Sequence, residues 1–329
     1  MKPHSLIVRA LCCTSLPCLV AGCPAGAPEL GRGPDRVARG AEELVDPGAF
    51  AVVLAAPRAL RAGPLGTAAA GWFEATPEEA ARGGPASWFR GLGGAERVVV
   101  AQHGAEEDPE TTLAVRGGDE AGRVLAQRLA DGANRREEPI VERECGDVRL
   151  FAAGPQAVGA FGAELFLLGP TERAERACPR AAGATTDGWA AEAGTAVLLE
   201  RLGTDAQLAY VGRVPVSLRR RLQHWGLDPL VDRRVGAAVT IGESTTRVRL
   251  VADVDDEAQA AALALSAAEG VERTAARRSF QAAGLSPLIR RLAPRSEGRF
   301  FHLEGELPTA VVAGVLSVLR TFEQATVDP

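Results

Sequence analysis

The chain has 329 residues, of which 46% are apolar and 24% are charged, and its formal net charge is −5. This length allows two ordinary domains, and the composition is typical of a globular protein rather than a disordered one. The acidic balance argues against general nucleic-acid binding, which needs a basic face that displaces counterions. Lys2 is the only lysine and Asn134 the only asparagine. A GC-rich coding sequence accounts for this bias, so we do not interpret the many arginines as phosphate-binding residues.

Residues 1–22 have the pattern of a secretory signal. Lys2 and Arg9 supply a positive start, and residues 10–22 form an apolar stretch that ends in small residues. This stretch is too short to span a bilayer, which requires roughly 20 apolar residues. Removal of residues 1–22, which hold two basic residues and no acidic one, takes the net charge from −5 to −7.

The leader ends in the sequence V-A-G-C at residues 20–23. This motif resembles the lipobox of bacterial lipoproteins, and the resemblance covers these residues only. It implies diacylglyceryl transfer to the Cys23 thiol, cleavage before Cys23 and acylation of the new amine. Several acyl chains hold a protein stably on a membrane. An envelope location follows, with the outer membrane favoured because Pro24, not an acidic residue, follows Cys23. The alternatives are a leader cleaved nearby and a small cysteine-rich N-terminal segment.

The remainder of the chain divides by composition. Residues 23–45 are rich in Pro, Gly, Ala and charge, and we expect a flexible tether there. We expect folded repeat domains over residues 46–180 and 185–325. The Gly-, Ala- and Thr-rich segment 179–188 marks the boundary between them.

The pattern of apolar residues predicts a similar order of elements in both halves. For the first half we expect a strand at 50–57, helix to about 91, strands at 96–103 and 111–117, a helix at 119–132, a hairpin around 145–146 and a strand at 164–169. For the second half we expect a helix at 189–202, a strand at 206–215, a helix at 216–226, a hairpin over 236–254, helices at 256–270 and to about 293, a strand at 298–307 and a final apolar helix at 308–323.

The two halves can be laid over one another. TTLAVRGGDEA (111–121) aligns with VRLVADVDDEA (248–258), which sets Asp119 on Asp256. Each half reads β-α-β-β-α-β, so we expect a tandem duplication. The predicted fold class is α+β, with two tandem ferredoxin-like domains, each an antiparallel sheet with helices on one face. The pattern over about 47–325 is similar to that of uncharacterised two-repeat bacterial envelope proteins, a resemblance that implies no activity.

Two cysteines remain after the leader and Cys23 are set aside. These are Cys145 and Cys178. An exported protein meets an oxidising environment, and an even remainder favours one disulfide. Two independent buried thiols are the alternative, because the spacing alone does not show how far apart the Cα atoms lie.

An acidic segment follows His103, made of Glu106, Glu107, Asp108 and Glu110. Oxygen-rich loops can hold calcium. This one lacks the alternating D-x-D-x-D-G pattern, so we expect a solvated hairpin tip. The histidines that follow the leader have no partner histidine at helical spacing, and we expect no metal site. They are His103, His224 and His302.

Catalytic motifs are missing from the sequence. It contains no G-x-S-x-G turn and no glycine-rich phosphate loop with a lysine, so we expect no cofactor, no nucleotide and no catalytic site. Arg219, Arg220 and Arg221 lie on a predicted helix, which we interpret as a solvated face. Contact with anionic lipids is the alternative.

The function most consistent with the sequence is a lipid-anchored, non-catalytic binding or structural module of the envelope. Its expected partners are the membrane and an unidentified envelope protein. An enzyme with an acid–base pair of carboxylates would require two of them to converge in a deep cleft. A small-ligand carrier would require a large apolar pocket.

Overall fold

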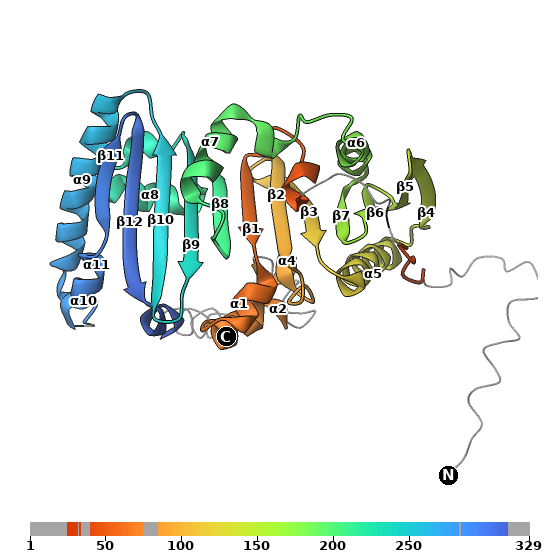
Figure 1. Ribbon diagram of the computed structural model, residues 1–329, viewed down its shortest axis with the longest axis horizontal. Coiled ribbons are helices and arrows are strands. Elements are labelled where there is room, and N and C mark those ends of the chain that lie inside the picture. Colours follow the sequence, from red (N-terminus) through yellow and green to blue (C-terminus); the bar gives the residue numbers. More distant parts are fainter. Residues whose placement is uncertain (1–24, 32, 34–39, 75–84, 283, 315–329) are drawn as a thin grey trace, which may run out of the picture.

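The computed structural model describes residues 25–31, 33, 40–74, 85–282 and 284–314. In this part of the chain twelve strands form one antiparallel sheet, in the order β11-β12-β10-β9-β8-β1-β2-β3-β7-β6-β5-β4 (Figure 1). The first half supplies β1 (Ala51–Ala55), β2 (Arg97–Ala105), β3 (Asp108–Arg116), β4 (Val141–Cys145), β5 (Val148–Ala153), β6 (Gln156–Gly162) and β7 (Leu165–Pro170). The second half supplies β8 (Leu208–Arg213), β9 (Arg234–Ile241), β10 (Thr245–Asp253), β11 (Ala293–Glu297) and β12 (Phe300–Pro308).

Helices cover both faces of the sheet. One face carries η1 (Ala41–Leu44), α6 (Thr171–Ala181), η2 (Trp189–Ala191) and α7 (Ala193–Leu202). The other carries α1 (Pro57–Ala62), α2 (Gly66–Phe73), α4 (Pro85–Phe89), α5 (Asp119–Arg136), α8 (Val216–His224), η3 (Asp228–Leu230) and α9 (Glu257–Ala275). Two short helices, α10 (Arg278–Ala282) and α11 (Ser286–Ile289), follow α9.

The alternation of side chains along β7 shows how one strand serves both layers. Leu165 and Leu167 point into the core beneath α6, whereas Phe166 points into the core beneath α5. Successive side chains of a strand lie on opposite faces, so a strand covered on both sides is apolar throughout. This explains why β7 has the sequence LFLLGP rather than an alternating one.

The two halves join through their first strands. β1 pairs antiparallel with β8, with Val53 opposite Tyr210, and this pair lies near the middle of the sheet. The α+β class is confirmed. The expectation of two separate ferredoxin-like sheets, each with helices on one face, is corrected to one continuous sheet covered on both faces. A β-α-β crossover joins parallel strands, whereas β1 and β2 are antiparallel neighbours.

Helix starts follow the predicted pattern in both halves. α9 begins after Asp256, whose Oδ1 accepts a hydrogen bond from the Gln259 backbone N–H at 2.8 Å. Asp119, its counterpart in the alignment of the halves, is the first residue of α5. Acidic side chains at these positions stabilise the first turn through capping and the helix dipole.

α6 and β11 were not predicted from the sequence. α6 occupies much of the expected end of the first domain, and its buried residues are the small Ala174, Ala177, Cys178 and Ala181 together with Arg180. β11 lies at the end of a predicted helical stretch and forms one edge of the sheet. Most of the final helix expected at 308–323 falls outside the described residues.

The segment predicted as a flexible tether lies partly against the body. Leu30 is only 8% exposed and belongs to the core beneath α5. Ala41 and Leu44 of η1 are buried in the opposite core, with Val45. Apolar side chains within the Gly- and Pro-rich segment therefore attach its described parts to the sheet.

Candidate functional site

The first described segment of the chain is held on α5 by the side chain of Asn134. Asn134 Oδ1 accepts a hydrogen bond from the Ala25 N–H at 2.6 Å, and Asn134 Nδ2 donates to the Ala25 carbonyl at 3.1 Å. Both backbone groups of Ala25 are thus bound by a single amide. We call residues 25–31 the strap.

The chain contacts the body again at Leu30, within the strap, and at Gly33, just beyond it. The Leu30 side chain enters the core beneath α5. Just beyond the strap, Gly33 lies directly on β6, where a Cβ atom would stand 2.6 Å from the Ala160 carbonyl oxygen and from the Gly162 nitrogen. The pairing of β6 with β7 shifts register between these two residues. Only a residue without a side chain fits this close approach.

A groove of about 820 Å³ lies between the strap and the first turns of α5. Its α5 side has little side-chain volume, because Gly122 and Ala126 lie one helical turn apart there. Phe166 of β7 also lines it and leaves no space above Gly122, where a Cβ would meet the phenyl ring at 2.7 Å. The charged lining residues are Glu29, Asp119, Glu120 and Arg123.

The predicted lipidation residue, Cys23, lies outside the described residues. The structure fixes the chain two residues later, at Ala25. Within the described part of the chain, no helix is long and apolar enough to cross a membrane.

Cys145 and Cys178 are joined by a disulfide, with their Cα atoms 6.1 Å apart. The bond ties β4, one of the two edge strands of the sheet, to α6. The Arg143–Glu175 ion pair, at 3.0 Å, links the same two elements. The disulfide thus fixes this edge strand to a helix of the body.

The acidic segment does not converge on a cation site. Glu106 binds Arg219 of α8, and Glu110 accepts a hydrogen bond from Arg173 Nη2 at 2.6 Å. In the described residues, no group of three or more His, Cys, Asp or Glu side chains has the arrangement of a metal site. Glu106 is only 22% exposed, so the expectation of a solvated tip is corrected at this residue.

Glu106 and Arg219 bring the two halves together beside Tyr210. Arg219 Nη2 lies 2.9 and 2.7 Å from the two carboxylate oxygens of Glu106. Burial raises the pKa of Tyr210 to about 12, and the negative charge of Glu106 adds to this effect. Of the other predicted arginines, Arg220 is exposed, and the side chain of Arg221 is not described.

A buried carboxylate that the sequence analysis missed organises the opposite face. Asp46 has a side chain only 3% exposed and contacts three arginines of α6, namely Arg173, Arg176 and Arg180. These recur at helical spacing and therefore lie on one side of α6. This spacing of the arginines is visible in the sequence and could have indicated a charged side of a helix. It could not have identified their partner Asp46, which lies 127 residues or more away in the sequence.

His103 lies in the same cluster. Its Nε2 is 3.2 Å from the Asp46 carbonyl oxygen. Burial lowers the pKa of His103, and the positive charge of Arg173 lowers it further, although the contact with Asp46 acts the other way. The cluster therefore favours a neutral imidazole and fixes η1, β2 and α6 relative to one another.

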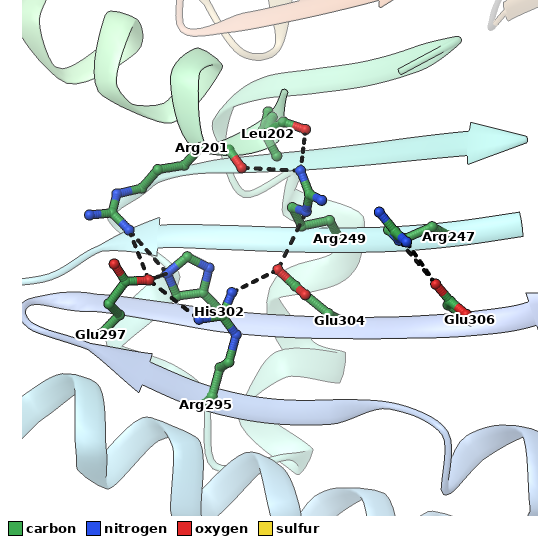
Figure 2. A network of polar contacts seen from close by, with 9 residues as sticks. All are labelled: Arg201, Leu202, Arg247, Arg249, Arg295, Glu297, His302, Glu304 and Glu306. Atoms are coloured by element: carbon green, nitrogen blue, oxygen red, sulfur yellow. Dashed lines mark hydrogen bonds and ion pairs between the residues drawn. The ribbon is translucent and has the colours of Figure 1, made fainter. Parts of the chain in front are cut away.

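A further polar network lies towards the other end of the sheet, on the face that α7 shares (Figure 2). We call it the charged face. It consists of Arg201, Arg247, Arg249, Arg295, Glu297, His302, Glu304 and Glu306. Neighbouring strands set opposite charges side by side, since Arg247 faces Glu306 and Arg249 faces Glu304 across β10 and β12. The corresponding ion pairs measure 2.8 and 3.4 Å.

His302 lies buried within the charged face, at 3% exposure. Its Nε2 is 3.4 Å from Arg201 Nη1 and 3.8 Å from Glu297 Oε2 (Figure 2). Burial lowers its pKa, and the charges of Arg295 and Arg201 lower it further. The network contains no serine, threonine, cysteine or lysine. Its arrangement can present paired charges to a partner.

The comparisons with known proteins give a distant likeness only. No family model matches the chain, and no curated protein matches it. Among solved structures, crystal forms III and I of TP0453 align with TM-scores of 0.44 and 0.43 and 10% identity. These alignments cover 84% and 85% of this chain and 97% of TP0453.

Proposed function

We propose that this chain is a lipid-anchored protein of the cell envelope that acts as a non-catalytic binding module. The observation that carries the proposal is the clamp of Asn134 on Ala25, two residues after the lipobox-like cysteine. A protein that is attached to a membrane through Cys23 would be held there by the α5 end of its body.

The position of the strap would determine how the anchored protein is oriented relative to the membrane. The strap and the neighbouring Gly33 touch α5, β5 and β6, near one end of the sheet, whereas the charged face lies on β10, β12 and β11 at the other end (Figure 1). Strands in a sheet are about 4.8 Å apart, so twelve strands separate the two ends by roughly 50 Å. The charged face would then point away from the anchor, towards an envelope protein.

The composition of the charged face supports recognition rather than catalysis. Its exposed members are ion-paired, for example Arg247 with Glu306 at 48% and 57% side-chain exposure. Such exposed charges favour a partner whose surface charges are complementary to them, and they raise the rate at which the two proteins associate.

The anchor is tested in cells that produce the full chain. Metabolic labelling with an alkyne fatty acid, followed by mass measurement of the N-terminal peptide, should show cleavage before Cys23 and acylation of Cys23. The Cys23→Ser variant should lose the label and leave the membrane fraction. An uncleaved or unacylated wild-type peptide would overturn the anchor.

The binding role is tested by reversing one ion pair. In Arg247→Glu/Glu306→Arg the pair is kept but its direction is inverted, so stability should change little. Crosslinking from a photoreactive residue at Thr245, on the adjoining part of β10, should capture an envelope protein with wild type and lose it with the reversed variant. Equal capture by both would exclude the charged face as the binding surface.

A further inference from the structure

We infer that the strap is a releasable contact that gives the anchored protein two tether lengths, one short and one long. The inference rests on the proposed function, because it requires a lipid at Cys23. It concerns the distance of the body from the membrane rather than the partner of the charged face.

The docked strap gives a very short link. Ala25 is fixed to Asn134, so Cys23 lies only two positions before the point where the chain meets the body. Two residues of extended chain reach about 7 Å. In this state the α5 end of the sheet lies against the membrane surface.

Release of the strap would lengthen the link greatly. Among the described residues, the next contact with the body after Leu30 is the close approach of Gly33 to β6. The link between Cys23 and Gly33 is then ten positions long, which corresponds to a mean span of about 18 Å for a flexible chain and about 33 Å when fully extended.

The contacts of the strap are few enough for both states to be populated. Leu30 is its only buried side chain, and both hydrogen bonds to Asn134 are solvent-exposed. The groove of about 820 Å³ beneath it leaves much of its underside without packing partners. Fixing seven residues costs conformational entropy that such contacts barely offset. Segments of this kind open locally without global unfolding.

The close contact at Gly33 offers a way to displace the strap without touching α5. In Gly33→Val the new side chain would collide with the backbone of β6, at Ala160 and Gly162. A matched control is Gly194→Val in α7, because nothing lies within 4 Å of a Cβ there. Leu30→Asp removes the buried anchor, and Leu265→Asp is its control, since Leu265 is 70% exposed.

The test measures energy transfer in the lipidated full chain reconstituted in vesicles. A donor dye is attached through a non-canonical amino acid at Glu144 in β4, and acceptor dyes are attached to the lipid headgroups. Wild type should show strong transfer with a minor weakly quenched population. Gly33→Val and Leu30→Asp should lower the transfer at least twofold, and both controls should match wild type.

Mass measurement of the same samples separates the two ways of failing. An N-terminal peptide without acyl chains would overturn the proposed function, and this inference with it. An acylated chain whose transfer efficiency is equal in wild type, Gly33→Val and Leu30→Asp would overturn the two tether lengths alone. Urea unfolding of each variant should give cooperative transitions, which shows that the body is intact.

Discussion

Arg219 binds both carboxylate oxygens of Glu106 through one nitrogen, across 113 residues of sequence. Glu106 lies at the turn between β2 and β3, and Arg219 lies on α8, so this pair joins side chains of the two halves. It is 22% exposed on the glutamate side and 31% on the arginine side, and it lies beside Tyr210. The pair thus closes one end of the seam that β1 and β8 form in the backbone.

Removing this pair should weaken the fold moderately. We expect Arg219→Ala and Glu106→Ala each to lower the free energy of unfolding by about 1 kcal/mol, because the pair is partly exposed. A double-mutant cycle by urea unfolding should give a coupling energy of similar size. Arg220→Ala, an exposed neighbour, is the control and should have almost no effect. A coupling energy near zero would mean that the contact adds nothing to the seam.

Asp46 should be much more sensitive. In Asp46→Ala the buried guanidinium of Arg180 loses its carboxylate, and we expect a loss of about 3–5 kcal/mol in unfolding free energy. Arg176→Ala should cost less than about 1 kcal/mol, since that side chain is 52% exposed. Chemical denaturation of the two variants measures the difference. Equal losses would contradict a buried centre at Asp46.

The disulfide should contribute substantially to stability. Bridging residues 33 apart in sequence lowers the entropy of the unfolded chain by an amount equivalent to roughly 3–4 kcal/mol on the chain-entropy model. Cys145→Ser/Cys178→Ser should therefore unfold at a clearly lower urea concentration than oxidised wild type. Reduced wild type should behave like the double variant. Unfolding midpoints that are the same with and without reductant would refute this contribution.

His302 should make stability dependent on pH. Its pKa is lowered in the folded protein, so the unfolded chain takes up a proton at a higher pH than the native protein does. Stability is therefore complete above the unfolded value near 6.5 and falls as the pH drops from there towards the folded value. Glu297 and Glu304 moderate the effect, because their charges favour the protonated form.

The measurement compares urea unfolding at pH 7.5 and 5.5. His302→Gln should lose less stability between these two pH values than wild type does. His103 also has a lowered pKa and stays in both proteins, so the comparison isolates His302. A variant that loses as much stability as wild type would show that folding does not lower the pKa of His302.

Much of the local structure follows from the sequence, whereas the long-range pairing does not. The strands β1, β2, β3, β8, β9 and β10 coincide with apolar runs, and Asp119 and Asp256 mark the starts of α5 and α9. The pairing of β1 with β8 could not be predicted from the local sequence, because apolar runs predict strands but not which strands become neighbours. β11 was missed because its sequence, APRSE, has neither an apolar run nor a clear alternation.

The candidate site shows the same division. The lipobox-like motif is local and could be recognised in the sequence. Asn134 stands out as the only asparagine of the chain, but compositional bias was sufficient to explain it. Its role depends on Ala25, 109 residues away, which the α5 pattern could not indicate. Side chains that fix a distant backbone segment need the tertiary structure to be found.

The pairing of β1 with β8 also affects how the two halves could have arisen and persisted. Each half, separated from the other, would expose a central, apolar strand edge that readily pairs with other chains and aggregates. Neither half is therefore a module that can be exchanged, lost or produced alone without new edge protection. If the halves descend from one ancestral unit, that unit was stable in one of two ways. It formed a dimer through this same strand edge, or its edge carried protective charged residues that were later replaced by apolar ones.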